Sequence, residues 1–69
     1  MNIKFAQRLK EIRTERGLRQ KDVAAAIGVT LQAICNYEAG TRDPSLDILC
    51  KLCDFFEVSA DYLLGRADY

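Results

Sequence analysis

Histidine is absent from this sequence of 69 residues. Histidine is the usual general base in catalysis and a common zinc ligand, so its absence argues against Ser or Cys catalytic triads and against most zinc sites. The sequence also contains no arrangement of nucleophile and base that is typical of an enzyme. We therefore expect a protein that is not an enzyme and that binds no cofactor and no metal.

Long apolar runs are missing as well. No segment approaches the roughly 18 apolar residues of a membrane-spanning helix, and the beginning of the chain lacks the apolar stretch of a signal peptide. One proline and four glycines occur, without repeats or low-complexity segments. We expect one ordered cytoplasmic domain over residues 1–69, frayed only at its ends and over 66–69, with no membrane partner and no evident small-molecule ligand.

Cysteine is present, but in an odd number, at positions 35, 50 and 53. In a chain without a secretion signal this favours free thiols in a reducing compartment. Cys50 and Cys53 form a CxxC pair, for which redox or metal chemistry is an alternative. Two thiols without histidine or a second cysteine pair make a poor zinc site, so we predict that Cys53 packs as a small apolar residue.

Neither sign of charge is in excess, because ten basic and ten acidic residues cancel. Their distribution is nevertheless uneven, since residues 1–21 hold seven basic and two acidic residues, whereas residues 22–69 hold three basic and eight acidic. Such a chain can present a positive face to a polyanion and an acidic face to solvent. Ordinary charged helix surfaces are the alternative explanation.

Apolar residues recur at helical spacing through most of the chain, and no segment alternates apolar and polar residues as a strand would. The spacing predicts five helices, over residues 3–16, 20–27, 31–38, 46–56 and 60–64. Glycines follow the first, second, third and fifth of these helices, where a left-handed residue ends a helix at little cost. Three hydroxyl residues are predicted to cap the starts of the last three helices: Thr30, Ser45 and Ser59.

The stretch over residues 20–39 is the most informative. A short helix with apolar residues on one face is followed by Gly28, which supplies the left-handed position that a sharp turn needs. Thr30 then opens a second helix. Ala24 falls where two steeply crossing helices come closest, so its methyl side chain permits a close approach. The pattern is helix, tight turn, helix.

This stretch resembles the helix-turn-helix motif of phage repressors, Cro proteins and related bacterial regulators. Within it the match is carried by Gln20, Ala24, Gly28, Ile34, Tyr37 and Glu38. Outside it the match continues through Leu9, Arg13, Gly17, Gly40, Pro44, Leu49, Leu52, Val58 and the closing DYLLG, so that residues 5–65 are covered. The resemblance implies an all-α, five-helix, lambda-repressor-like DNA-binding domain of a bacterial or phage-encoded protein that acts at the nucleoid.

In that family the second helix of the motif lies in the DNA major groove. On a helix that starts at Leu31, the outward face carries Leu31, Gln32, Cys35 and Asn36, which we predict read the bases. The two amides can pair with adenine, each worth about 1–3 kcal/mol of discrimination, and Leu31 and Ala33 are candidates for contact with a thymine methyl. Cys35 is expected to be exposed there, where its oxidation could block DNA binding.

The resemblance assigns Gln20 to a phosphate contact, which the backbone donors at the start of its helix would favour. Further candidates for phosphate contacts are Lys21, Thr30, Thr41 and Arg42. Arg19 stands where the family usually has a capping Ser or Thr, and we interpret it as a phosphate contact instead, with Asp22 offsetting part of the lost cap through the helix dipole. For Gln20 and Arg19, an ordinary exposed side chain is the alternative.

Arg13 and Glu38 occupy positions that form a buried ion pair between the first and third helices of the resembled repressors. We therefore predict a structural role for both residues. Removing one partner of such a pair leaves a buried charge unpaired.

One recognition helix covers few base pairs, so proteins of this kind usually bind as two-fold dimers. We predict a dimer surface from apolar residues near the end of the chain, against the alternative that they are ordinary core: Phe55, Tyr62, Leu63 and Leu64. The sequence thus predicts a transcriptional regulator, most simply a repressor, that binds a short palindromic operator in double-stranded DNA as a homodimer. The alternative is a protein-interaction module or antitoxin component that keeps the fold.

Overall fold

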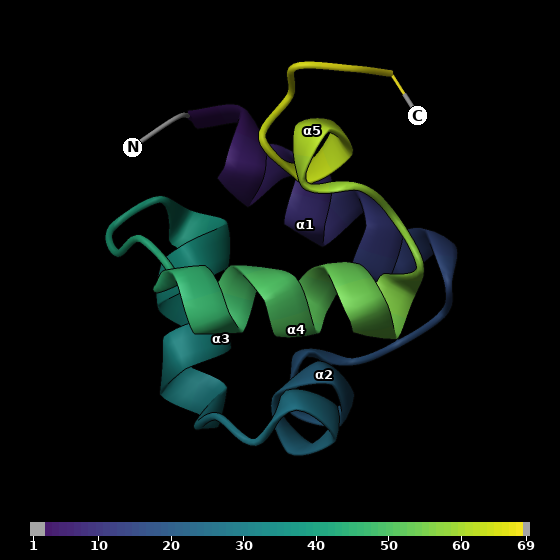
Figure 1. The fold of residues 1–69 in the computed structure, drawn as a ribbon. Coiled ribbons are helices and arrows are strands. Elements are labelled where there is room, and N and C mark those ends of the chain that lie inside the picture. The colour runs from purple at the N-terminus through teal and green to yellow at the C-terminus, as the bar shows by residue number, and fades with distance from the viewer. Residues whose placement is uncertain (1–2, 69) are drawn as a thin grey trace.

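The computed structural model describes residues 3–68, which form five helices and no strand (Figure 1). The helices are α1 (Ile3–Glu15), α2 (Gln20–Ile27), α3 (Leu31–Ala39), α4 (Leu46–Phe56) and α5 (Ala60–Leu63). The predicted all-α, five-helix fold is confirmed. Three boundaries differ from the prediction by one residue, because α1 and α5 end one residue earlier and α3 ends one residue later.

α4 crosses the middle of the molecule (Figure 1). In this view α1 and α5 lie on one side of α4, α2 lies on the other side, and α3 lies at the end where α4 begins. α3 packs against both α1 and α2, whereas α4 packs against α2 and α5. α3 is therefore held from its inner side by two neighbours.

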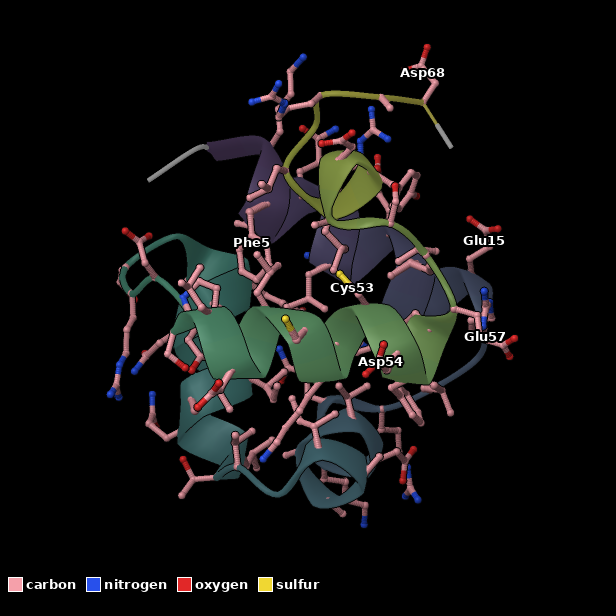
Figure 2. All side chains as sticks on the ribbon, in the orientation of Figure 1. Phe5, Glu15, Cys53, Asp54, Glu57 and Asp68 are labelled. Atoms are coloured by element: carbon pink, nitrogen blue, oxygen red, sulfur yellow. The ribbon has the colours of Figure 1, made fainter. Side chains whose placement is uncertain are left out.

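One apolar core joins all five helices. The largest fully buried side chains come from every helix: Phe5, Leu9, Val23, Ile34, Leu52, Phe56 and Leu63. The side chain of Phe5 points from α1 into the interior (Figure 2), where its ring meets Tyr37 edge-on with 6.2 Å between centroids. Helices this short are marginal alone, and burial at about 1.5–3 kcal/mol for each large apolar side chain holds them together.

Side-chain caps begin the last three helices at the predicted residues. The hydroxyls of Thr30, Ser45 and Ser59 each accept a hydrogen bond from the backbone N–H three residues later, at 3.0–3.2 Å. The end of α4 was not predicted. Glu57 ends this helix in the left-handed region with φ of 57°, a conformation that glutamate rarely adopts.

The segment over residues 66–68 lies against α1, and the fraying predicted for it stays a prediction. The Arg8 guanidinium donates to the backbone oxygen of Ala67 at 3.2 Å and lies 3.5 Å from the Asp68 carboxylate. An arginine on α1 therefore fixes a segment that has little apolar side-chain surface of its own. Tyr69 lies outside the described residues.

Candidate nucleic-acid interface

The turn between α2 and α3 has the predicted geometry. Gly28 has φ of 76°, and the backbone N–H groups of Gly28 and Val29 both donate to the backbone oxygen of Ala24 at 3.0 Å. A Cβ on Gly28 would meet no neighbouring atom within 4 Å, so its backbone angle is what requires glycine here. Ala24 is buried beneath the turn. The sequence thereby fixes the direction in which α3 leaves α2.

α3 presents two different sides. Ala33, Ile34 and Tyr37 are buried in the core. Leu31, Gln32, Cys35 and Asn36 lie on the other side of the helix, the first two exposed and the last two half-buried. The structure thus brings the four predicted base-reading residues onto one face. The predicted thymine contact of Ala33 is wrong, because this side chain is 8% exposed and belongs to the core side.

The two amides on the outer face are bonded to each other. Gln32 Nε2 donates to Asn36 Oδ1 at 3.0 Å, one helical turn further along α3. This pairing was not part of the sequence prediction, although residues four apart on a helix are neighbours and their spacing could have indicated it.

An ion pair joins α1 to the inner side of α3. Arg13 Nε lies 2.6 Å from Glu38 Oε2, and Arg13 Nη2 donates to Glu38 Oε1 at 3.0 Å. The two side chains are only 12% and 4% exposed. Arg13 also donates to the backbone oxygen of Leu18 at 2.8 Å. Its hydrogen bond to Glu38 raises the pKa of Arg13, so the guanidinium stays charged inside the fold.

Gln20 connects this ion pair to the outer face. Its Nε2 donates to Glu38 Oε1 at 3.1 Å, and its Oε1 accepts a hydrogen bond from the Cys35 thiol at 3.2 Å. Cys35 is consequently half-buried, and its predicted exposure is wrong. One N–H of the Gln20 amide is left for a phosphate, because a primary amide carries two donors.

A shallow recess of about 400 Å³ opens beside this network. It is lined by Lys10, Arg13, Gln20, Cys35, Glu38 and Ala39. Lys10 was missed as a candidate phosphate contact. Its spacing from Arg13 could have found it, since residues three apart share one side of a helix.

Arg19 is already occupied by a carboxylate in the structure. Its guanidinium lies 3.2 Å from the Asp22 carboxylate, and its backbone N–H donates to the same carboxylate at 2.8 Å. Asp22 therefore helps to start α2 by accepting hydrogen bonds, in addition to any effect of the helix dipole. The side-chain contact with Arg19, followed by the backbone contact, lowers the pKa of Asp22 below its usual range.

The other predicted phosphate contacts lie on the surface around α3. Thr30 precedes α3 and Thr41 and Arg42 follow it, while Lys21 lies in the first turn of α2, and all four are exposed. The Thr41 hydroxyl donates to the backbone oxygen of Asn36 at 3.3 Å. Their contact with phosphates stays a prediction.

The arginines of residues 1–21 are all used inside the molecule. Arg13 and Arg19 contact the carboxylates of Glu38 and Asp22. Arg16 donates to the backbone oxygen of residue 56, and Arg8 contacts the segment over residues 67–68. The positive face that the charge distribution suggested is therefore partly neutralised. Figure 2 shows three acidic residues, Glu15, Glu57 and Asp68, on the side of the molecule away from α3, whereas the exposed Asp43 and Asp47 follow α3 in the chain.

The predicted dimer residues do not form one surface. Leu63 is completely buried, so its assignment to a dimer surface is wrong, and Leu64 is half-buried. Phe55 is 38% exposed and lines a groove of about 620 Å³ with residues 25–27 of α2 and with Gly28. Tyr62 instead lies under the Arg8 guanidinium of α1, 4.7 Å from its ring centroid. α1 and α2 are on opposite sides of α4 (Figure 1).

The CxxC pair carries two different thiols. Cys53 is half-buried against the core, and this burial raises the pKa of its thiol, while Cys50 is exposed. A thiol with a raised pKa is a weaker metal ligand and nucleophile. Within residues 3–68 no three His, Cys, Asp or Glu side chains come together as a metal site. Nor is any helix there long and apolar enough to cross a membrane.

The sequence profile of the family described as "Helix-turn-helix" matches residues 9–63. This chain belongs to that helix-turn-helix family. It is 42% identical over 62 residues to the HTH-type transcriptional regulator ImmR of Bacillus subtilis, covering 90% of this chain and 49% of that protein. It is 39% identical over 64 residues to the cryptic phage CTXphi transcriptional repressor RstR of Vibrio cholerae, covering 93% and 58%. The resemblance to phage repressors is confirmed, and these relatives are regulators and not enzymes.

Solved structures agree with this assignment. The restriction-modification controller protein C.AhdI of Aeromonas hydrophila superposes with a TM-score of 0.82 at 34% identity, over 88% of this chain and 92% of that chain. A transcriptional regulator from Listeria innocua gives 0.85 at 28% identity, over 91% and 59%. The chain spans about half the length of the curated relatives it matches.

Proposed function

We propose that this chain is a sequence-specific regulator of transcription, most simply a repressor, that binds double-stranded DNA through α3. The observation that carries the proposal is the outer face of α3. It presents Leu31 and a pair of amides to solvent, while the inner side of the same helix is fixed by the core and by the Arg13–Glu38 ion pair. A rigid helix with polar, uncharged groups on one open face suits the reading of base edges in a major groove.

The phosphate contacts proposed for this complex surround α3. Thr30 lies at its beginning, Thr41 and Arg42 follow its end, and Lys21, Gln20, Arg19 and Lys10 come from α1 and the start of α2. Contacts of this kind orient the protein on DNA without reading its sequence, and they make the affinity fall as salt rises.

The proposal includes a homodimer. α3 has nine residues, a length of about 14 Å, and so reaches only a few base pairs. Two copies related by a two-fold axis would read a palindrome whose half-sites are about 34 Å apart, one turn of DNA. Such a protein would act in the bacterial cytoplasm at the nucleoid. ImmR, RstR and C.AhdI, whose names mark them as regulator, repressor and controller, support the proposal by similarity.

The test is selection from a pool of random duplex DNA, followed by sequencing, at two salt concentrations. We expect enrichment of a two-fold motif. A variant with Gln32→Ala and Asn36→Ala should lose this enrichment and keep weak, salt-sensitive binding, because the phosphate contacts remain. A control is the variant with Gln7→Ala and Glu11→Ala, which removes another exposed side-chain hydrogen bond between residues four apart, on α1. It should enrich the same motif as the unchanged protein.

A protein-interaction module is the second candidate. It is favoured by the zero net charge and by the use of the four N-terminal arginines inside the molecule. A folded protein that enriches no DNA motif at either salt concentration would support this candidate and would overturn the proposed DNA-binding function.

A further inference from the structure

Gln32 and Asn36 form the one side-chain hydrogen bond that the described structure shows within the outer face of α3. Gln32 Nε2 donates to Asn36 Oδ1 at 3.0 Å. Gln32 is exposed and Asn36 is half-buried, so both amides border the surface that is proposed to meet DNA. The bond therefore exists in the free protein, before any base is contacted.

In the structure this bond gives each amide one orientation. A primary amide has an oxygen that accepts and a nitrogen that donates, on opposite arms of the same plane. The nitrogen of Gln32 is directed along the helix and uses one of its two N–H groups on Asn36, so the oxygen Oε1 lies on the arm that points away from Asn36. The oxygen of Asn36 is directed back to Gln32, which leaves the donors on its nitrogen Nδ2 for an outside acceptor.

We propose that Gln32 and Asn36 read DNA as one coupled unit of fixed polarity. Gln32 Oε1 accepts a hydrogen bond from an exocyclic amine, and Asn36 Nδ2 donates to an acceptor on a neighbouring base pair. In the major groove the amines belong to adenine and cytosine, and the acceptors are N7 of purines, O6 of guanine and O4 of thymine. The inference rests on the proposed function and adds the order of the contacts along α3.

Coupling follows from the same bond. Each side chain holds the other in one orientation, so truncating either one releases the amide that remains. A released amide can turn over and can offer its donor where its acceptor was needed. The preference for the correct base is then reduced at both positions, although only one residue has been changed.

The first experiment is a double-mutant cycle on the selected operator. The ratio of affinities for the operator and for operators with one base pair changed is measured for the unchanged protein, Gln32→Ala, Asn36→Ala and the double variant. Loss of one good contact reduces such a ratio by about tenfold to a hundredfold. We expect each single variant to lose most of what the double variant loses. The variant with Gln7→Ala and Glu11→Ala, which breaks a side-chain hydrogen bond of the same spacing on α1, should keep the affinity ratio of the unchanged protein.

The second experiment tests polarity with two changes that add the same charge to the same face. Gln32→Glu keeps an acceptor toward the base, whereas Asn36→Asp keeps the acceptor for Gln32 but removes every donor toward the base. Both variants should bind all DNA less tightly, and competition with non-specific DNA cancels that shared effect. We expect Gln32→Glu to retain the preference for adenine or cytosine at its base pair and Asn36→Asp to lose the preference at its own.

The outcomes separate this inference from the proposed function. Losses that simply add in the cycle, or retention by Asn36→Asp with loss by Gln32→Glu, would overturn the coupled unit while leaving sequence-specific binding intact. If the unchanged, folded protein shows no sequence preference, the proposed function fails and the inference fails with it.

Discussion

The two sides of α3 differ in almost every physical respect. The inner side carries Ile34 and Tyr37 in the core and Glu38 in a buried ion pair with Arg13. The outer side carries the exposed Leu31 and the amides of Gln32 and Asn36, which are hydrogen-bonded to each other. Because successive residues on a helix point in directions about 100° apart, stability and recognition can be carried by one short helix without sharing side chains.

The separation is incomplete at one place. Gln20 accepts from Cys35 on the outer side and donates to Glu38 on the inner side. A change in this bridge would be felt by both sides. The comparison therefore predicts inner-side variants that unfold the domain, outer-side variants that alter only DNA preference, and few variants that do both.

Arg13→Ala is expected to have the largest effect on the inner side. It leaves the Glu38 carboxylate, which is 4% exposed, without its ion partner, and broken pairs of this kind cost about 4 kcal/mol of the free energy of unfolding. Urea unfolding at neutral pH measures the effect. Arg19→Ala is the control, because its ion pair is largely exposed and such pairs contribute about 0–1 kcal/mol. Equal urea midpoints for the two variants would refute the distinction.

Leu63→Ala should have the next largest effect on the free energy of unfolding. Leu63 is completely buried, and truncating a buried leucine typically costs about 2–5 kcal/mol. Leu46→Ala makes the same chemical change at a side chain that is 80% exposed, where effects stay within about 0.5 kcal/mol. Thermal unfolding compares the two. If Leu63→Ala had the same melting temperature as the unchanged protein but a different oligomeric state, the rejected assignment of Leu63 to a dimer surface would be restored.

Leu63 also shows how far the sequence could be read. Five helices, the side-chain caps of the last three and the turn at Gly28 were predicted, since helical spacing, capping hydroxyls and left-handed glycines are local signals. Which apolar residues of a four-residue helix are buried depends on how that helix meets α1 and α4, and its sequence is too short to show a face. The left-handed backbone of Glu57 was not predicted either, because nothing in the residue type glutamate indicates this conformation.

The candidate site divides in the same way. Helix periodicity indicated which four residues share the outer face, and the resemblance implied that this face reads the bases. The hydrogen bonds from Cys35 to Gln20 and from Gln20 to Glu38 did not follow from the sequence, because they join residues 15 and 18 positions apart. Contacts across helices depend on the packing angles of the whole domain.

Gly28→Ala tests the turn that sets the direction of α3. The expected cost is about 1–2 kcal/mol, because the left-handed conformation at φ of 76° strains any side chain, although no neighbouring atom blocks a Cβ. Glu57→Gly is the reverse change at a comparable angle and should raise stability. Unfolding midpoints in urea measure both. A Gly28→Ala variant as stable as the unchanged protein would show that the turn tolerates another backbone angle.

The smallest expected effect concerns the exposed pair at the start of α2. Arg19 lowers the pKa of Asp22 in the folded state, so the carboxylate contributes stability above the ordinary aspartate pKa of about 3.9. That contribution is lost as the pH falls through the lower folded pKa. Titration of the Asp22 carboxyl carbon by NMR should give a higher pKa in Arg19→Ala.

Arg42→Ala is the control. It removes an exposed arginine that follows α3 in the sequence, and it should leave the pKa of Asp22 unchanged. The stability difference between Arg19→Ala and the unchanged protein should shrink as the pH falls through the lowered pKa of Asp22. A phosphate that draws Arg19 away from Asp22 removes the contact that lowers this pKa, so a phosphate contact of that kind should raise the pKa of Asp22 when the unchanged protein binds DNA. An Asp22 pKa that does not move on binding would mean that Arg19 keeps its contact with the carboxylate and is not transferred to a phosphate.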